Sequence, residues 1–339
     1  MGRNIVDLTK IQATPVVRDI TNKYILLYGK QKVGKTTFAV QCPNTLFFCF
    51  EEGVNAHEVK KASIDTWETF LAELRQLKKE ETKKLYQTIV IDTVDKMWEL
   101  CDQYYCDRSG VELLQEVGGF GKGYTLTKKA FSRALKDITA LGYGLILLCH
   151  VKESEVTLPN GKVANKYEPN LSSAAQEVVN SLVDITGYID KKWDLDASGN
   201  FVLDEWGLPV EKRVLITRNT PTIVAGSRFR FLPPVMEFDY NMFAKNLREA
   251  IEKEQTEGGQ RLVNSRADVE EEKVLRSYDE ALDEAKEEWV RLVTEDETNA
   301  ERVLAIATRI MNTPIQRLSD IKEDSLEKFE SILDEMRKM

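Results

Sequence analysis

The residues best suited to chemistry follow an apolar run at 24–28 and have the sequence Gly29-Lys30-Gln31-Lys32-Val33-Gly34-Lys35-Thr36-Thr37. The spacing G-x-x-x-x-G-K-T is typical of the loop that binds the phosphates of a nucleoside triphosphate. Its glycines allow a tight turn with inward-pointing N–H groups, and a helix beginning at Lys35 presents its positive end to the same anion. Lys35 offers an ammonium to the β- and γ-phosphates, and the Thr36 hydroxyl is a ligand for Mg²⁺. The pattern predicts that residues 29–37 bind ATP with Mg²⁺.

A second acid is needed to position the metal, and Asp92 stands where one is expected. It ends the apolar run 88–91, which is typical of a buried strand. In phosphoryl-transfer enzymes with this loop, such an acid holds Mg²⁺. The alternative is that Asp92 caps the following helix, but Thr93 is the better candidate for that role. We therefore assign Thr36 and Asp92 to the metal.

Two further apolar runs end in polar residues that are candidates for catalysis. Glu51 and Glu52 follow the run 44–50, and a carboxylate there can polarise the attacking water. Glu52 is the first choice, and a solvent-exposed loop acid is the alternative. His150 ends the run 145–149, where a hydrogen bond to the γ-phosphate would let it sense phosphate loss; the alternative is a core histidine bonded to the backbone. The predicted catalytic residues are Lys35, Glu52, Asp92 and His150.

Apolar runs alternate with segments of helical periodicity through residues 1–257. Strands buried on both faces favour an α/β fold with a mainly parallel sheet covered by helices. The last expected strands follow one another without a helix, which favours an antiparallel edge, and residues 152–175 suggest a long loop or hairpin. We expect strands at 24–28, 44–50, 88–92, 145–150, 185–189, 212–218 and 228–231, and helices at 35–41, 67–79, 94–105, 126–141 and 240–254.

The C-terminal part differs from the rest in charge. Residues 258–339 contain 13 Lys and Arg against 21 Asp and Glu, so they hold −8 of the net charge of −9. A polar, glycine-containing stretch predicts a linker at 258–271, and helical periodicity predicts a small acidic all-α domain at 272–339. We expect either a solvated helical bundle or a contact surface for a single-strand-binding or replication protein.

Neither a membrane protein nor an exported one is indicated. No run of about 18 apolar residues is present, and the first residues lack the apolar core of a signal peptide. The five cysteines form no CxxC pair, and there are only two histidines. These counts favour reduced thiols in the cytoplasm and argue against a zinc site.

In the order of its elements the chain resembles the RecA-like recombinase core, and most closely the phage-encoded RecA-like single-strand annealing ATPases. The resemblance covers about residues 20–255 and rests on GKQKVGKTT, FEEG, TIVIDTVD, GFGKGY, GLILLCHVK and RVLITRN. It implies a RecA-like ATPase fold, the catalytic glutamate at Glu52, and the phosphate sensor at His150, where recombinases often have Gln. It also implies the bacterial host cytoplasm and a homo-oligomer, although only about 20 residues precede the first strand, where recombinases have a polymerisation domain.

The same resemblance implies two DNA-binding loops, at about 107–124 and 152–175. Their basic groups suit phosphates and their aromatic rings suit stacking on bases, which is what a sequence-tolerant single-strand site needs. Glutamates in the same segments reduce their net positive charge, so the alternative is that both are ordinary surface loops. The residues assigned to single-stranded DNA are Arg108, Phe120, Lys122, Tyr124, Lys152, Lys162, Lys166 and Tyr167.

These observations predict a Mg²⁺-dependent ATPase that acts on single-stranded DNA and promotes strand annealing or recombination in phage DNA metabolism. The alternative is an ATP-gated loader or adaptor that switches protein contacts with little turnover. Arginines on the late strands can reach a neighbouring subunit's γ-phosphate or form surface salt bridges; they are Arg213, Arg218, Arg228 and Arg230.

Overall fold

The structure is a computed structural model that describes residues 16–52, 57–118, 121–258, 262–263, 278–321, 326–336 and 339. The chain forms two compact units, one within Pro15–Asp268 and the other including Val269–Met339. Each has its own hydrophobic core. The larger unit contains every residue assigned to chemistry.

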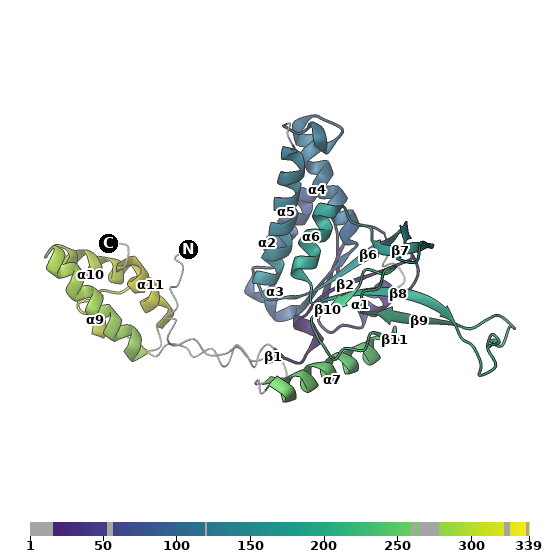
Figure 1. The fold of residues 1–339 in the computed structure, drawn as a ribbon. Helices are drawn as coiled ribbons and strands as arrows, with labels where there is room; N and C mark the ends of the chain where they lie inside the picture. Colours follow the sequence, from purple (N-terminus) through teal and green to yellow (C-terminus); the bar gives the residue numbers. More distant parts are fainter. Residues whose placement is uncertain are drawn as a thin grey trace. The chain divides into compact units, whose positions relative to one another are not determined.

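A ten-stranded sheet with a parallel centre forms the middle layer of the larger unit (Figure 1). Its main path runs β11-β9-β8-β2-β6-β5-β3-β4, with parallel pairing from β8 to β4 and antiparallel pairing at β8–β9 and β9–β11. The predicted mainly parallel sheet with an antiparallel edge is confirmed. The strands are β2 (Tyr24–Gly29), β3 (Thr45–Cys49), β4 (Lys61–Ser63), β5 (Thr88–Asp92), β6 (Gly144–Thr157), β7 (Val163–Pro169), β8 (Ile185–Trp193), β9 (Glu211–Ile216), β10 (Gly226–Ser227) and β11 (Val235–Glu237).

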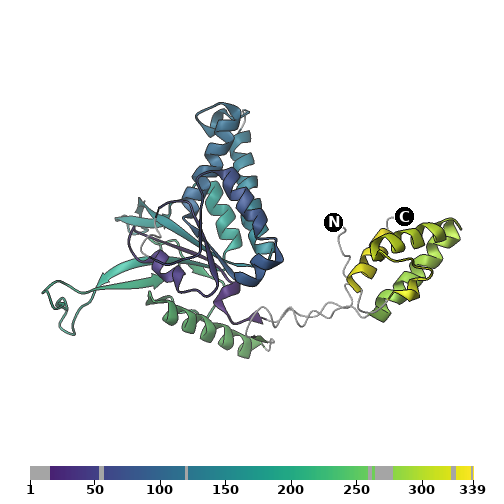
Figure 2. The same ribbon diagram turned by 180° about the vertical axis from the view of Figure 1, so that it is seen from behind.

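Helices cover both faces of this sheet because its central strands are apolar on both sides. Along β2, Leu26 and Tyr28 face one core, whereas Ile25 and Leu27 face the other. The first core is built with α2 (Trp67–Gln76), α4 (Val94–Ser109), α5 (Lys122–Ala140) and α6 (Ser173–Leu182), and the second with α1 (Lys35–Val40) and α7 (Tyr240–Gly258). Figure 2 shows the same layers from behind. The shorter elements are β1 (Val16–Val17), η2 (Ile20–Asn22), α3 (Glu80–Leu85), η3 (Leu114–Glu116) and β12 (Leu262–Val263).

The register of the parallel strands brings the candidate site residues to one edge of the sheet. Gly29 at the end of β2 is opposite His150 in β6. Asp92 at the end of β5 is opposite Leu148 in β6 and Cys49 in β3. Ligands of open parallel sheets bind outside the carboxyl ends of the strands, which is this edge.

Several segments differ from the elements expected from sequence, although the hairpin expected as one alternative for residues 152–175 is confirmed. β6 continues past His150 to Thr157 and pairs antiparallel with β7. The short strand β4 and the helix α3 were not expected. The helix α6 was not expected; Ser172 caps its first turn by accepting the N–H of Ala175. The expected strand at 228–231 is wrong, because the chain pairs at β10 and β11 on either side of it and uses Phe229 and Phe231 for packing.

The smaller unit is helical where it is described. It contains α9 (Tyr278–Glu295), α10 (Asn299–Met311), η4 (Leu318–Asp320) and α11 (Leu326–Met336), packed around a core that includes Leu292, Val303 and Phe329. Apart from Gly258 and residues 262–263, the predicted linker at 258–271 lies outside the described residues. No helix in the described ranges has the length and hydrophobicity needed to cross a membrane.

Candidate nucleotide-binding site

The loop between β2 and α1 has glycine at its two tightest positions. Gly34, the residue before α1, has φ 99°, which is the left-handed region that favours glycine. A Cβ at Gly29 would lie 2.8 Å from the carbonyl oxygen of Ile189, so no larger residue fits there without a shift. The loop therefore has the tight turn that a phosphate-binding backbone requires.

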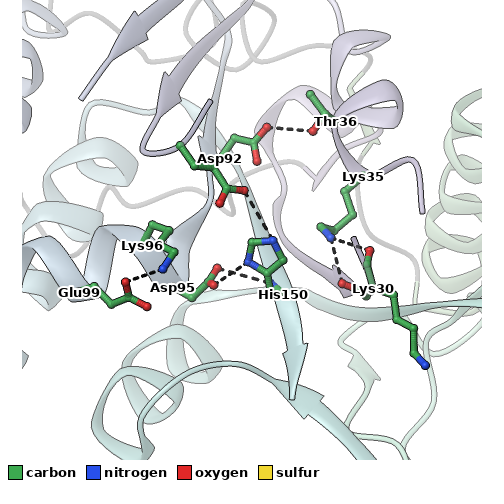
Figure 3. Close-up of polar contacts among 10 residues, drawn as sticks. Lys30, Lys35, Thr36, Asp92, Asp95, Lys96, Glu99 and His150 are labelled. Atoms are coloured by element: carbon green, nitrogen blue, oxygen red, sulfur yellow. Dashed lines mark hydrogen bonds and ion pairs between the residues drawn. The ribbon is translucent and has the colours of Figure 1, made fainter. Parts of the chain in front are cut away.

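Lys35 begins α1 and is buried, with 7% of its surface exposed. Its Nζ donates to the carbonyl oxygens of Gly29 at 2.9 Å and Lys30 at 3.0 Å (Figure 3). Burial lowers its pKa, and the Asp92 carboxylate opposes that shift. The loop's own carbonyls thus hold the ammonium inside the turn, where a phosphate would meet it.

Thr36 and Asp92 come together from different elements. The Thr36 hydroxyl, in the first turn of α1, donates to Oδ2 of Asp92 at 2.9 Å, and Asp92 is 4% exposed. Burial raises the pKa of Asp92, while the hydrogen bond from Thr36 and the charge of Lys35 act in the opposite direction. A hydroxyl and a carboxylate are both hard oxygen ligands, so this pair fits Mg²⁺.

His150 is held by an acid that the sequence analysis did not single out. Its Nδ1 lies 2.8 Å from Oδ2 of Asp95, and its backbone N–H donates to Oδ1 of the same carboxylate at 3.4 Å. Asp95 is in the first turn of α4 and is 3% exposed. Asp95 follows Asp92, the last residue of β5, by only three positions, and this closeness to a strand-end acid is the sequence signal that points to it.

The pKa of His150 is raised and the pKa of Asp95 is lowered, as expected for an ion pair between them. The hydrogen bond to Asp95 raises the pKa of His150 against the effect of burial, and Glu51 adds to the rise. Burial favours a higher pKa for Asp95, but the hydrogen bond and charge of His150 outweigh it and lower the pKa. Protonated His150 therefore stabilises the fold below its unfolded pKa of about 6.5, and this contribution is lost as pH rises through the folded value.

Replacing Asp95 with Asn is expected to lower the pKa of His150, because the amide keeps the shape but not the charge. Titration of the imidazole signals by NMR measures this directly, since the chain has only His57 and His150 and a His57→Gln variant assigns them. Glu99→Gln, in the same helix, is the matched control and should leave the titration unchanged. An unaltered pKa in Asp95→Asn would contradict the pairing.

Of the two adjacent glutamates, the structure places Glu51 beside His150. Oε1 of Glu51 is 3.6 Å from Nε2 of His150, and burial raises the pKa of Glu51. Glu52 is exposed. The Glu51 side chain helps to line a cavity of about 400 Å³ with Gly29, Lys30, Gln31, Asp95, Lys96, His150, Val151 and Asn170.

Comparison with known proteins decides the family. A family model described as an AAA domain matches residues 21–229, which is more than half of the chain. The chain belongs to the AAA domain family. The SPbeta prophage-derived uncharacterized protein YorG of Bacillus subtilis (strain 168) is similar, with 27% identity over 265 residues that cover 75% of this chain and 74% of that protein. The larger unit is therefore a P-loop ATPase-type domain.

The remaining residues of the phosphate loop in this AAA domain differ in their contacts and exposure. The Lys30 ammonium is ion-paired with Glu153 at 2.9 Å, and the Thr37 hydroxyl is 3.2 Å from Nε2 of His57. Val33 is buried, whereas the two remaining positions, Gln31 and Lys32, are exposed. Phosphate binding by these residues would come from their backbone N–H groups.

The first predicted DNA loop of the AAA domain is partly helical. Lys122 begins α5, and Tyr124 is exposed in its first turn. Arg108 is in the last turn of α4, where it donates to the hydroxyl of Tyr104 at 2.6 Å. Phe120 lies outside the described residues. These residues stay a prediction for DNA binding.

The second predicted loop is the β6–β7 hairpin. Lys152 and Lys162 are exposed, and Lys166 is ion-paired with Glu168 at 2.8 Å. Tyr167 stacks on Tyr188 with ring centroids 5.3 Å apart, and its carbonyl accepts the hydroxyl of Tyr28. Tyr167 is therefore engaged within the domain, and DNA binding by the lysines of this segment stays a prediction.

The four arginines on or near the late strands have different surroundings. Arg228 is paired with Asp184 at 3.0 Å, and Arg230 is 3.8 Å from Glu257. Arg213, on β9, has its Nη1 against Gly34, so close that a Cβ at that position would clash with it. Arg218 is exposed beyond the end of β9. Arg213 is thus the arginine that lies against the phosphate loop of its own chain.

Proposed function

We propose that this AAA domain protein is a Mg²⁺-dependent ATPase that acts on single-stranded DNA and promotes strand annealing or recombination in phage DNA metabolism. The observation that supports it most is the position of His150. It lies in the nucleotide site, and its strand continues directly into the β6–β7 hairpin with its exposed lysines. The prophage-derived relative supports the phage setting.

Nucleotide binding rests on three side chains and the loop backbone. Lys35 neutralises the β- and γ-phosphates from within the turn. Thr36 and Asp92, which are 2.9 Å apart, are the residues that would hold Mg²⁺. The ion would supply charge neutralisation at the transferring phosphate. The positive charge of the ion would offset the free-energy cost of burying the Asp92 carboxylate.

Glu51 is the carboxylate that we assign to the attacking water. It accepts the proton of the water, and its raised pKa makes it a better acceptor than a fully solvated glutamate. His150 donates to the terminal phosphate while Asp95 fixes the orientation of its ring. When that phosphate leaves, His150 loses its hydrogen-bond partner. The resulting movement of His150 is transmitted along β6, the strand that carries it.

One of the two faces of the hairpin carries two lysines and one glutamate. Lys152 is opposite Glu168, and Ser154 is opposite Lys166, so the two lysines share a face. Glu153 and Glu155 alternate with them and belong to the opposite face. Lys162 adds a third cation at the turn. Glu168 shares the lysine face and is ion-paired with Lys166, so only Glu153 and Glu155 are separated from the lysines.

Single-stranded DNA is expected to stimulate ATP hydrolysis, and the double variant Lys152→Glu/Lys162→Glu to weaken oligonucleotide binding. Loss of two phosphate contacts should reduce the slope of log affinity against log salt by about 1.4. Fluorescence anisotropy with a labelled oligonucleotide at several salt concentrations measures both. Lys136→Glu, an exposed lysine of α5, is the control. Unchanged binding in the double variant, with no stimulation of the parent protein, would remove DNA from the proposal.

The second candidate function is an ATP-gated adaptor that switches protein contacts. The ion pair of Lys166 with Glu168 and the packing of Tyr167 against Tyr188 favour it, because both reduce what the hairpin offers to DNA. An adaptor would turn over slowly and show no response to oligonucleotide. The same ATPase measurement therefore separates the two functions.

A further inference from the structure

A projecting arm connects β8 to β9. Residues 193–210, here called the arm, extend beyond the sheet at the end of these two strands (Figure 1). The arm is folded on itself: the N–H of Val202 donates to the carbonyl of Asp194 at 3.0 Å, and that of Val210 to the carbonyl of Val202 at 2.8 Å. Two turns are closed by Asp196 and Asp204, whose carboxylates accept backbone N–H groups. The arm thus presents a defined surface.

That surface is strongly apolar. Six large hydrophobic side chains of the arm are more than half exposed: Trp193, Leu195, Phe201, Leu203, Trp206 and Leu208. Leu195 is bridged to Phe201, and residues two apart in extended chain share a face, so the first four of these side chains lie on one face. The rings of Trp193 and Phe201 are 6.0 Å apart. Apolar surface concentrated in this way marks a site of protein contact.

The arm is also acidic. Between residues 193 and 210 there are four acids, Asp194, Asp196, Asp204 and Glu205, and no lysine or arginine. Asp194, at the base of the arm, is ion-paired with Lys212 of β9, so the acidic character belongs to Asp196, Asp204 and Glu205 in the outer part of the arm. The partner that fits the arm is an apolar surface surrounded by cations.

The same domain has a surface of that kind on its helical face. A groove of about 500 Å³ lies between α2, α4 and α5, and its apolar lining includes Trp67, Leu71, Leu74, Tyr104, Tyr105, Leu126, Ala130 and Ala134. Four cations and one acid complete the lining: Arg75, Lys78, Lys129, Arg133 and Asp137. Within the described part of the chain, none of the four cations forms an ion pair. The groove is therefore the complement of the arm in both hydrophobicity and charge.

We propose that the arm of one copy docks into the groove of a second copy. The arm extends away from the end of the domain where α2, α4 and α5 lie, in both views, so it cannot reach its own groove (Figures 1 and 2). Arm and groove are different surfaces, so the contact is head-to-tail and repeats from copy to copy until a ring closes or a filament grows. The apolar side chains and acids of the arm are complementary to the apolar lining and four cations of the groove, which favours the arm as the occupant of the groove. This contact stands independently of the DNA-binding function proposed above.

Two full-length variants and their mixture test the contact. Trp206→Ser/Leu208→Ser removes exposed side chains of the arm, and Arg75→Glu/Arg133→Glu reverses two exposed cations of the groove. Sedimentation velocity should show the parent protein associating with concentration and each variant weakened about tenfold or more, as for the loss of hot-spot contacts. An equimolar mixture should form a dimer and stop there, because only one intact arm and one intact groove can meet.

The control reverses two exposed lysines outside the groove, Lys84 and Lys136, and should assemble like the parent. A parent protein that stays monomeric at every concentration would overturn the proposal, and so would variants that assemble normally or a mixture that yields no dimer. Binding of an oligonucleotide that Arg75→Glu/Arg133→Glu weakens, with assembly unaltered, would also overturn it and assign the groove to nucleic acid.

Discussion

Lys35→Ala is expected to abolish ATP binding and hydrolysis. The side chain is buried in the loop and holds its ammonium against the carbonyls of Gly29 and Lys30, where the phosphates would displace those contacts. Alanine leaves the triphosphate charge without its main counterion in a site of low dielectric. Loss of one preorganised donor of this kind costs about 10²- to 10³-fold in rate.

Calorimetry with ATP and Mg²⁺ measures the loss of affinity, and phosphate release measures the loss of turnover. Lys84→Ala is the matched control, because Lys84 is an exposed lysine of α3 remote from the loop in sequence. A thermal melt of both variants establishes that the fold is intact. Wild-type affinity in a folded Lys35→Ala protein would contradict the assignment of the loop itself.

Glu51→Gln is expected to stop hydrolysis while leaving ATP binding close to normal. Glu51 is the glutamate that lines the cavity beside His150, and burial raises its pKa, which makes the carboxylate a better proton acceptor. Glutamine keeps the size and loses the base, so turnover should fall by about 10²- to 10⁴-fold. Separate measurement of binding and single-turnover rates distinguishes this result from a loss of affinity.

Glu52→Gln is the decisive comparison, since Glu52 was the first choice from sequence. Its side chain is exposed, so its replacement should alter turnover little. The opposite result, an inactive Glu52→Gln with an active Glu51→Gln, would return the role to Glu52. Two inactive variants would mean that the carboxylates act together at the site.

The local features of this AAA domain could be predicted from the sequence because each depends on neighbouring residues. The turn at Gly29 to Thr36 follows from glycine freedom and helix initiation, and the apolar runs around it follow from burial on both faces of a parallel sheet. Asp92 could be placed at a strand end for the same reason. The helices α1, α2, α4 and α5 begin within four residues of where periodicity placed them.

The site's pairings could not be predicted in this way, because they depend on strand order. His150 meets Asp95 across 55 positions of sequence only because β5 and β6 are neighbours in the sheet. The choice between Glu51 and Glu52 depends on which side chain the bend after β3 turns toward His150. Arg213 reaches Gly34 because β9 folds back on β8 beside the loop.

The sequence by itself determined that a phosphate loop sits on a mainly parallel α/β sheet, since residue types at fixed short spacings dictate both. Only the tertiary structure decided which acids face the loop, and that an apolar acidic arm and a basic apolar groove occupy opposite parts of one domain. The physical reason is that a hydrogen bond or a groove needs groups within a few ångströms of one another. Residues distant in sequence acquire such distances only when the sheet and its helices pack together.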